Sequence, residues 1–248
     1  MQGRYIEKYF FETLNSTNDK AKQILNDNPM LEKIYVRSEV QESGRGQFAR
    51  IWESEKGKNL LISIGIRAVS VPIEQSNLIS ELAAIAVFNV LSRKNIIQIS
   101  IKWPNDIYVG NKKVAGILIE NTFVGNKIEK TIIGIGLNVN QTEFSEGLPN
   151  PVSMKQITGE AFDIGQIGEE IVNEVFSLLN RKSEIHLLYN KYLYRLGELT
   201  EFFNSENNVF LGVILGVDAS GCLEVRVENA RVNTYMHGEV SLKIPSVN

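Results

Sequence analysis

Cysteine is nearly absent from this sequence, with Cys222 as the single example among 248 residues. One thiol excludes an internal disulfide framework and a cysteine-rich metal site, and it is typical of proteins from a reducing compartment. No apolar run approaches the roughly 20 residues needed to cross a bilayer, and the first residues lack the apolar segment of a signal peptide. The sequence therefore predicts a cytoplasmic protein that does not engage a membrane.

Basic residues are not in excess either. Lys and Arg number 26 against 29 Asp and Glu, which gives a formal net charge of -3 at pH 7. A protein that binds nucleic acid non-specifically usually shows an overall basic balance or a strong basic block. We therefore expect no nucleic-acid partner, and any cation that matters must act locally.

Histidine is scarce, and the common catalytic signatures are missing from the sequence. His186 and His237 lie far apart without the spacing of metal ligands, so neither is expected to be catalytic. No Ser-His-Asp or Cys-His pattern supports nucleophilic hydrolysis. Neither a Walker lysine motif nor a strand-glycine-helix dinucleotide fingerprint is present, which disfavours the standard mononucleotide folds.

Predicted strands and helices fill most of the chain. Residues 78–94 form the clearest amphipathic helix, which we expect to pack on a sheet. Turns at 110–112 and 125–126 join consecutive strands as hairpins, which predicts an antiparallel or mixed sheet. The expected strands are 5–14, 34–38, 60–66, 97–103, 107–109, 114–122 and 131–137, and the expected helices are 20–26, 78–94, 167–179 and 183–195.

After Gly197 the sequence changes from alternating helices and strands to short apolar segments separated by polar turns. Short strands expected at 209–217, 222–227 and 234–244, separated by polar turns, predict a small all-β barrel. We therefore expect two domains. Residues 1–196 form an α+β domain with a mixed or antiparallel sheet and flanking helices, and residues 197–248 form the barrel.

Charged and amide side chains stand between two strands that should be buried. In Lys102-Trp103-Pro104-Asn105-Asp106, the proline fixes the exit from a predicted strand and holds Asn105 and Asp106 at its end. A simple Asx turn would account for the same residues. Lys113 lies between a turn and the apolar run 114–119, where its ammonium could enter a pocket beside Ala115 and Gly116 or point to solvent.

Three further segments combine flexible or polar residues. Gly44 to Trp52 contains two arginines whose side chains suit phosphate oxygens, although a solvated hairpin has the same composition. Gly134 and Gly136 end a buried strand, either to admit a ligand or for a structural twist. Ser16-Thr17-Asn18 offers donors to a neutral polar ligand, or only a helix cap.

Taken in order, these segments resemble the biotin protein ligases. The set comprises Ser16-Thr17-Asn18, residues 41–47, Trp52, residues 102–106, 113–116 and 134–138, and residues 216–218 and 238–242 near the C-terminus. The resemblance spans the whole chain. It implies the class II synthetase-like catalytic fold of the biotin and lipoate ligases, followed by an SH3-like barrel.

The resemblance implies a two-step reaction. The carboxylate of biotin attacks the α-phosphate of ATP and releases pyrophosphate, and a lysine of a biotin carboxyl carrier protein then attacks the biotinyl-adenylate. Because a carboxylate and a polyphosphate repel one another, cations around the developing charge offset that repulsion in a water-poor site. ATP, Mg²⁺ and biotin are the expected small molecules, and no metal ion ligated directly by the protein is inferred.

By similarity, three residues are expected to be catalytic. Lys113 reaches the biotin carboxylate, Arg45 and its glycine-rich loop fold over the phosphates, and Asp106 assists the acceptor lysine. The residues expected to bind biotin are Ser16, Thr17, Asn18, Gln41, Arg45, Gly46, Gln47, Lys113 and Gly116. Those expected to bind the nucleotide are Arg45, Trp52, Lys102, Asn105 and Asn138.

Two features differ from the common pattern of the family. Many members carry a second basic run after Gly-Arg-Gly, whereas here Gln47-Phe48-Ala49 precedes Arg50, so retention of the adenylate depends more on burial and on Arg45. Some members begin with a helix-turn-helix domain that makes them biotin-responsive repressors. This sequence enters the catalytic domain within its first residues, so a monofunctional enzyme is expected.

Two alternative functions stay open. A lipoate ligase or octanoyltransferase shares the general fold and also modifies a carrier lysine, although the ordered motifs favour biotin. A non-catalytic biotin sensor would bind a protein partner through a sheet edge. Arg45 and Lys113 argue against the sensor, because it needs no phosphate chemistry. A homodimer and a monomer are equally compatible with the sequence.

Overall fold

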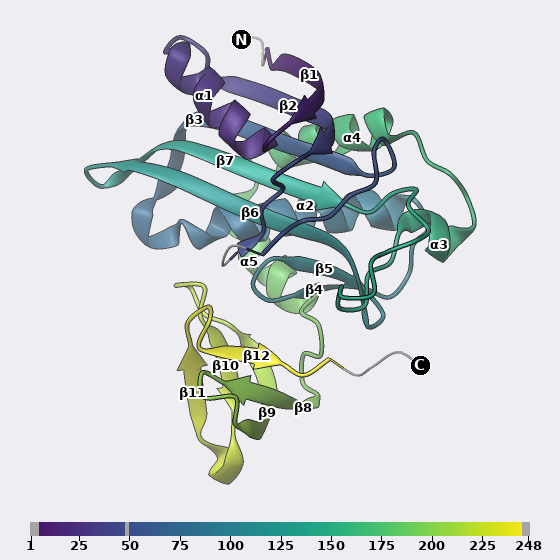
Figure 1. Cartoon of the computed structure of the whole chain (residues 1–248). Coiled ribbons are helices and arrows are strands. Elements are labelled where there is room, and N and C mark those ends of the chain that lie inside the picture. The colour runs from purple at the N-terminus through teal and green to yellow at the C-terminus, as the bar shows by residue number, and fades with distance from the viewer. Residues whose placement is uncertain (1–4, 48–49, 245–248) are drawn as a thin grey trace.

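The computed structural model describes residues 5–47 and 50–244 and contains two β-sheets (Figure 1). β1 pairs with β2 in parallel, and the other neighbouring strands of the larger sheet are antiparallel, so the predicted mixed sheet is confirmed. In spatial order the larger sheet consists of β1 (Glu7–Leu14), β2 (Lys33–Gln41), β3 (Leu60–Pro72), β7 (Lys127–Leu137), β6 (Lys112–Val124), β5 (Asp106–Val109) and β4 (Ile99–Lys102).

Helices cover both faces of the larger sheet (Figure 1). On one face, Ala21, Ile24 and Leu25 of α1 (Thr17–Asp27) form a small core with Ile34, Val36 and Ile132 of the sheet. On the other face lie α2 (Asn77–Arg93) and α4 (Ile164–Leu178), and α5 (Lys182–Lys191) packs against α2. The flanking helices of the predicted α+β fold are therefore present.

α2 differs from the amphipathic helix that the sequence predicts. It packs against β4, β5 and β6 on one side and against α4 and α5 on the other. Its apolar residues therefore face two layers instead of forming one stripe. The helix is buried over most of its surface, and even Glu81 is only 3% exposed.

The C-terminal sheet consists of β11 (Val232–Tyr235), β10 (Leu223–Arg226), β9 (Val209–Val217), β8 (Leu199–Asn204) and β12 (Val240–Leu242), in that spatial order. Two expectations are wrong here. Over the described residues the sheet is open, so the predicted barrel is not closed. The strand predicted at 234–244 is divided in two, because Glu239 N–H donates to Met236 C=O in a turn where Gly238 has a φ of 95°.

One described strand and one described α-helix were not predicted, β8 and the short helix α3 (Met154–Thr158). Two single-turn 3₁₀ helices are also present among the described residues, η2 (Ile73–Gln75) and η3 (Glu228–Ala230). None of the helices within the described ranges is long and apolar enough to cross a membrane.

Candidate functional site

Small residues hollow the face of the larger sheet that carries α1. Ser63 and Leu118 both pair with Gly134, and Gly116 pairs with Gly136, so these residues share the face of Ile132. A Cβ atom added to Gly134 would clash with the side chain of Asn18. One added to Gly136 would clash with the ring of Trp52. The two glycines therefore allow Asn18 and Trp52 to lie directly against the sheet.

A cavity of about 970 Å³ opens over this hollow. From the C-terminal sheet and its loops, residues 203–205, 207 and 237–244 complete its wall. Phe48 and Ala49 of the glycine-rich loop lie outside the described residues. Each residue to which the sequence assigns a role lines the cavity, namely Ser16, Thr17, Asn18, Gln41, Arg45, Gly46, Gln47, Trp52, Lys102, Asn105, Asp106, Lys113, Gly116 and Asn138.

The start of α1 supplies the neutral polar part of the cavity. Ser16 Oγ caps the helix by accepting from Asp19 N–H. The backbone N–H and Oγ1 of Thr17 donate to Gln41 Oε1 at 2.7 and 2.9 Å. The buried Ser63 Oγ lies 2.8 Å from Thr17 Oγ1 and 2.5 Å from Asn18 Oδ1. These bonds fix donors and acceptors side by side, which suits a neutral ligand that has both.

Arg45 is held by carboxylates. Its Nη2 lies 2.6 Å from Asp19 Oδ1 and 3.8 Å from Glu120 Oε1, and Glu120 Oε2 also accepts from Asn18 Nδ2 at 2.7 Å. The Arg45 side chain is 44% exposed. An anionic ligand that binds Arg45 would therefore exchange places with these carboxylates.

The glycine-rich loop folds back on itself beside the cavity. Gly46 N–H donates to Arg50 C=O, and Trp52 N–H donates to Gly44 C=O. Trp52 then lies across the sheet, and a Cβ atom at Gly116 would come 2.9 Å from its ring. Its buried Nε1–H lacks a hydrogen-bond partner among the described residues. Trp52 therefore forms an apolar wall between the polar floor and Lys113.

A cluster of cations surrounds one carboxylate at the other end of the cavity. Lys113 Nζ lies 2.6 Å from Asp106 Oδ1 and 5.5 Å from the centre of the Trp52 ring. Burial lowers the pKa of Lys102, the cations Lys113 and Arg50 lower it further, and Asp106 opposes the decrease. Three basic side chains and one carboxylate thus act on the same end of the cavity, which suits a polyanion.

Asn105 and Asn138 support the walls of the cavity. Asn105 Nδ2 donates to Ile117 C=O at 2.6 Å, and Asn138 Nδ2 donates to Val152 C=O at 3.1 Å. Both amides are thus engaged by the backbone. Over the described ranges, the His, Cys, Asp and Glu side chains form no group of three or more that could hold a metal ion.

Several lining or supporting residues were missed from the sequence. Ser63 had a signal, because Ser63 and Gly65 recur with period two in an otherwise apolar strand and mark one face. Asp19 and Glu120 had none, because their contacts with Arg45 depend on the folded chain. His237, which was expected to be non-catalytic, also lines the cavity.

Comparison with known proteins identifies the fold class. Over 96% of its length the chain superposes on 99% of the biotin protein ligase from Aquifex aeolicus in complex with biotin and ATP, with a TM-score of 0.80 and 23% identity. The biotin protein ligase from Leishmania major in complex with biotinyl-5-AMP gives a TM-score of 0.63 over 93% of this chain and 98% of that chain, with 22% identity. The architecture is therefore that of the biotin protein ligases.

Sequence comparison gives the family. Residues 10–138 match the model of the biotin/lipoate A/B protein ligase family. The bifunctional ligase/repressor of Bacillus subtilis is 32% identical over 86% of this chain and 67% of its own length. The chain belongs to the biotin/lipoate A/B protein ligase family. The predicted resemblance and the expectation of an enzyme are confirmed.

Proposed function

We propose that this chain is an ATP-dependent biotin protein ligase that forms biotinyl-5′-AMP and transfers biotin to a lysine of a biotin carboxyl carrier domain. The observation that carries the proposal is the division of one cavity into a neutral polar floor and a cationic end. Biotin has the same division, with a neutral ureido ring at one end and a carboxylate at the other. The matched relatives named as biotin ligases support this assignment.

In the proposed complex, the ureido ring lies on the floor formed by Thr17, Asn18 and Gln41, with Ser16 close by. The ureido group has two N–H donors and one carbonyl acceptor, which match the mixed groups of that floor. The apolar chain of biotin passes Trp52 and Gly116. Its carboxylate then reaches Lys113.

The polyphosphate of ATP, with Mg²⁺ as its counter-ion, occupies the cationic end in the proposed complex. Lys113, Lys102 and Arg50 reduce the repulsion between the biotin carboxylate and the α-phosphate. Arg45, with Gly46 and Gln47 of its loop, leaves Asp19 and covers the anion. Asn105 and Asn138 hold the walls of the nucleotide pocket. Asp106 releases Lys113 to the adenylate and faces the incoming carrier lysine.

Two domains are proposed for this reaction. Residues 1–196 bind both substrates, and residues 197–248 close the cavity from the opposite side. The role of the second domain is supported by its segments 203–205 and 237–244, which line the same cavity as Lys113 and Asp106.

Lipoate fits this cavity less well than biotin. Its dithiolane ring has no hydrogen-bonding group, so the buried polar groups of Thr17, Asn18 and Ser63 would face a ring that cannot bond to them. A site built to hydrogen-bond its substrate rejects an analogue that lacks those groups. The polar floor therefore favours biotin over lipoate.

The test is pyrophosphate release from MgATP with biotin, lipoate or neither acid. We expect biotin-dependent release and at most a trace with lipoate. Release with lipoate alone would move the chain to the lipoate branch of the family. Biotin binding without pyrophosphate release would favour the sensor.

A further inference from the structure

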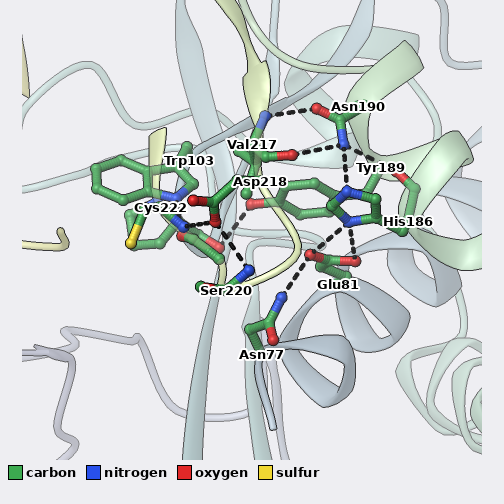
Figure 2. Close-up of polar contacts among 12 residues, drawn as sticks. Asn77, Glu81, Trp103, His186, Tyr189, Asn190, Val217, Asp218, Ser220 and Cys222 are labelled. Atoms are coloured by element: carbon green, nitrogen blue, oxygen red, sulfur yellow. Dashed lines mark hydrogen bonds and ion pairs between the residues drawn. The ribbon is translucent and has the colours of Figure 1, made fainter. Parts of the chain in front are cut away.

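Two adjacent residues near the end of α5 form hydrogen bonds in two directions, Tyr189 to the loop between β4 and β5 and Asn190 to β9 of the C-terminal sheet (Figure 2). Tyr189 is buried, and its hydroxyl donates to Pro104 C=O at 2.9 Å. Asn190 brackets Val217, because its Oδ1 accepts from Val217 N–H at 2.6 Å and its Nδ2 donates to Val217 C=O at 3.1 Å. One helix turn therefore holds both the loop before Asp106 and the end of β9.

Asn190 also contacts His186, one turn earlier on α5. Since Oδ1 accepts from Val217, Nδ2 is the atom that lies 3.2 Å from His186 Nε2. Nδ2 also donates to the backbone C=O of His186 at 3.1 Å. The Glu81 carboxylate lies 3.1 Å from His186 Nδ1 and also accepts from Asn77 Nδ2 (Figure 2). The orientation of Asn190 is thus set from both sides.

The turn between β9 and β10 continues this connection to the active site. Asp218 Oδ1 accepts from the backbone N–H groups of Ser220 and Cys222 at 2.8 and 3.0 Å, which makes the turn rigid. Gly221 C=O at its tip accepts from Trp103 Nε1 at 3.0 Å. Trp103 is therefore held by the C-terminal sheet, whereas the next residue, Pro104, is held by α5.

β4 is the last strand of the larger sheet, and its outer edge depends on the same region. Ile101 N–H donates to Tyr192 C=O, and Tyr194 N–H donates to Ile101 C=O. The segment after α5 thus lies along β4, and β4 leads into the loop that ends at Asp106. The 2.6 Å contact between Asp106 and Lys113 lies at the end of this series of contacts.

We propose that Tyr189 and Asn190 are positioning residues, which hold the loop Trp103–Asp106 so that Asp106 stays against Lys113. Neither side chain touches the proposed substrates. The kinetic consequence rests on the proposed ligase function, whereas the effect on the Asp106–Lys113 pair does not. The C-terminal sheet thereby takes part in the geometry of the active site.

The experiment compares Tyr189→Phe and Asn190→Ala with the control Tyr192→Phe, which removes a hydroxyl three residues away on a ring that stacks on Phe88. The first readout is the acetylation rate of Lys113 relative to Lys112, measured by peptide mass spectrometry below the melting temperature of each variant. Loss of an ion-pair partner should speed Lys113 acetylation by about three- to fivefold in the two network variants.

The second readout is the kinetics of biotin-dependent pyrophosphate release. We expect kcat to decrease by about tenfold in both network variants, while KM for biotin changes less than about twofold, because misplacement affects the reacting groups more than binding. Tyr192→Phe should match the wild type in both readouts. Tyr189→Phe removes one oxygen only, so it decides the matter even where Asn190→Ala fails to fold.

Unchanged Lys113 acetylation in folded Tyr189→Phe would overturn the proposal, as would an unchanged kcat in an active enzyme. A wild type without pyrophosphate release would contradict the ligase function instead. The acetylation rates would then still decide whether Tyr189 and Asn190 position the pair.

Discussion

At the scale of single residues, Lys113 is placed by rigid neighbours. Its backbone N–H donates to Asn150 C=O and its C=O accepts from Val152 N–H, so an extra segment pairs with β6 at this point. The side chain then passes the Trp52 ring to Asp106. A cation fixed in this way is preorganised for charge that develops during a reaction.

Replacement of Lys113 by alanine tests this role. We expect Lys113→Ala to lower the rate of biotinyl-adenylate formation by about a hundredfold or more, the usual effect of removing one preorganised group that stabilises the transition state. Pyrophosphate release measures the rate. Lys112→Ala, one residue earlier on β6, serves as the matched control and should stay within about twofold of the wild type. An unaltered rate in Lys113→Ala would remove Lys113 from the mechanism.

The glycines of the cavity floor make a second prediction. In Gly134→Ala the new methyl group would clash with Asn18, so we expect a loss of about 1–3 kcal/mol in unfolding free energy. Biotin affinity should fall as well, because Asn18 must move away from Ser63. Urea unfolding and calorimetric titration give the two values.

Gly147→Ala is the control for this prediction, since a Cβ atom there meets nothing within 4 Å. If Gly134→Ala had the same stability and biotin affinity as Gly147→Ala, the close approach of Asn18 to the sheet would be unimportant for both stability and biotin binding.

The residues of the cavity were predictable where charged and amide types interrupt apolar strands, as at Lys102, Asn105 and Lys113. Such residues are costly to bury without a purpose, so their presence is informative. The partners of these residues were not predictable. Asp19 and Glu120 meet Arg45 only because the N-terminal end of α1 reaches β6 in the folded chain, where Asn18 bonds to Glu120. Their roles, like those of the motif residues, stay predictions until they are tested.

At the scale of elements, α2 shows how tertiary packing overrides a sequence pattern. The helix places Glu81 between the sheet and α5, where burial raises the pKa of its carboxyl group. The contacts of Glu81 with His186 and Asn77 oppose this increase without cancelling it. When the pKa of a carboxyl group is higher in the folded protein than in the unfolded chain, the folded state is more stable with that group protonated.

The pH dependence of stability follows from that shift. The stability that Glu81 contributes is complete below its ordinary pKa of 4.5 and decreases as pH rises through the higher pKa of the folded protein. We therefore expect Glu81→Gln to have a higher melting temperature than the wild type at pH 8. The difference should shrink toward pH 4.5, where the wild-type carboxyl group is increasingly protonated.

Thermal unfolding at several pH values checks this expectation. A difference in melting temperature that stays constant between pH 4.5 and pH 8, or a less stable variant at pH 8, would contradict it. Glu184→Gln on the exposed part of α5 is a suitable control, because its carboxylate pairs with Arg181 at the surface, where such a pair contributes little.

The two elements missed from the sequence have local reasons. In β8, Leu199 is exposed while Thr200 is buried, so the hydrophobic alternation of a strand is inverted at its start. α3 has five residues, too few to show helical periodicity. Its capping box between Ser153 and Gln156 was the available signal. Long elements such as α2 and β7 were predicted because they contain enough apolar residues to indicate a buried helix or strand.

At the scale of the whole molecule, the two sheets share one cavity. The short strands expected after Gly197 predicted a separate β-structure there, and the C-terminal strands form a separate sheet. It could not predict that this sheet is open, or that its residues 237–244 line the same cavity as Lys113. Both outcomes depend on contacts such as Trp103 with Gly221, which join distant parts of the chain.

The central claim is that the protein attaches biotin to a lysine of a carrier protein, in the cavity that the two sheets share. The most direct measurement is mass spectrometry of a purified carrier domain after incubation with the protein, MgATP and biotin, with lipoate in a parallel reaction. We predict a gain of one biotinyl group on a single lysine in the first reaction and no gain in the second. A gain with lipoate alone, or no gain with either acid despite biotin binding, would contradict the claim.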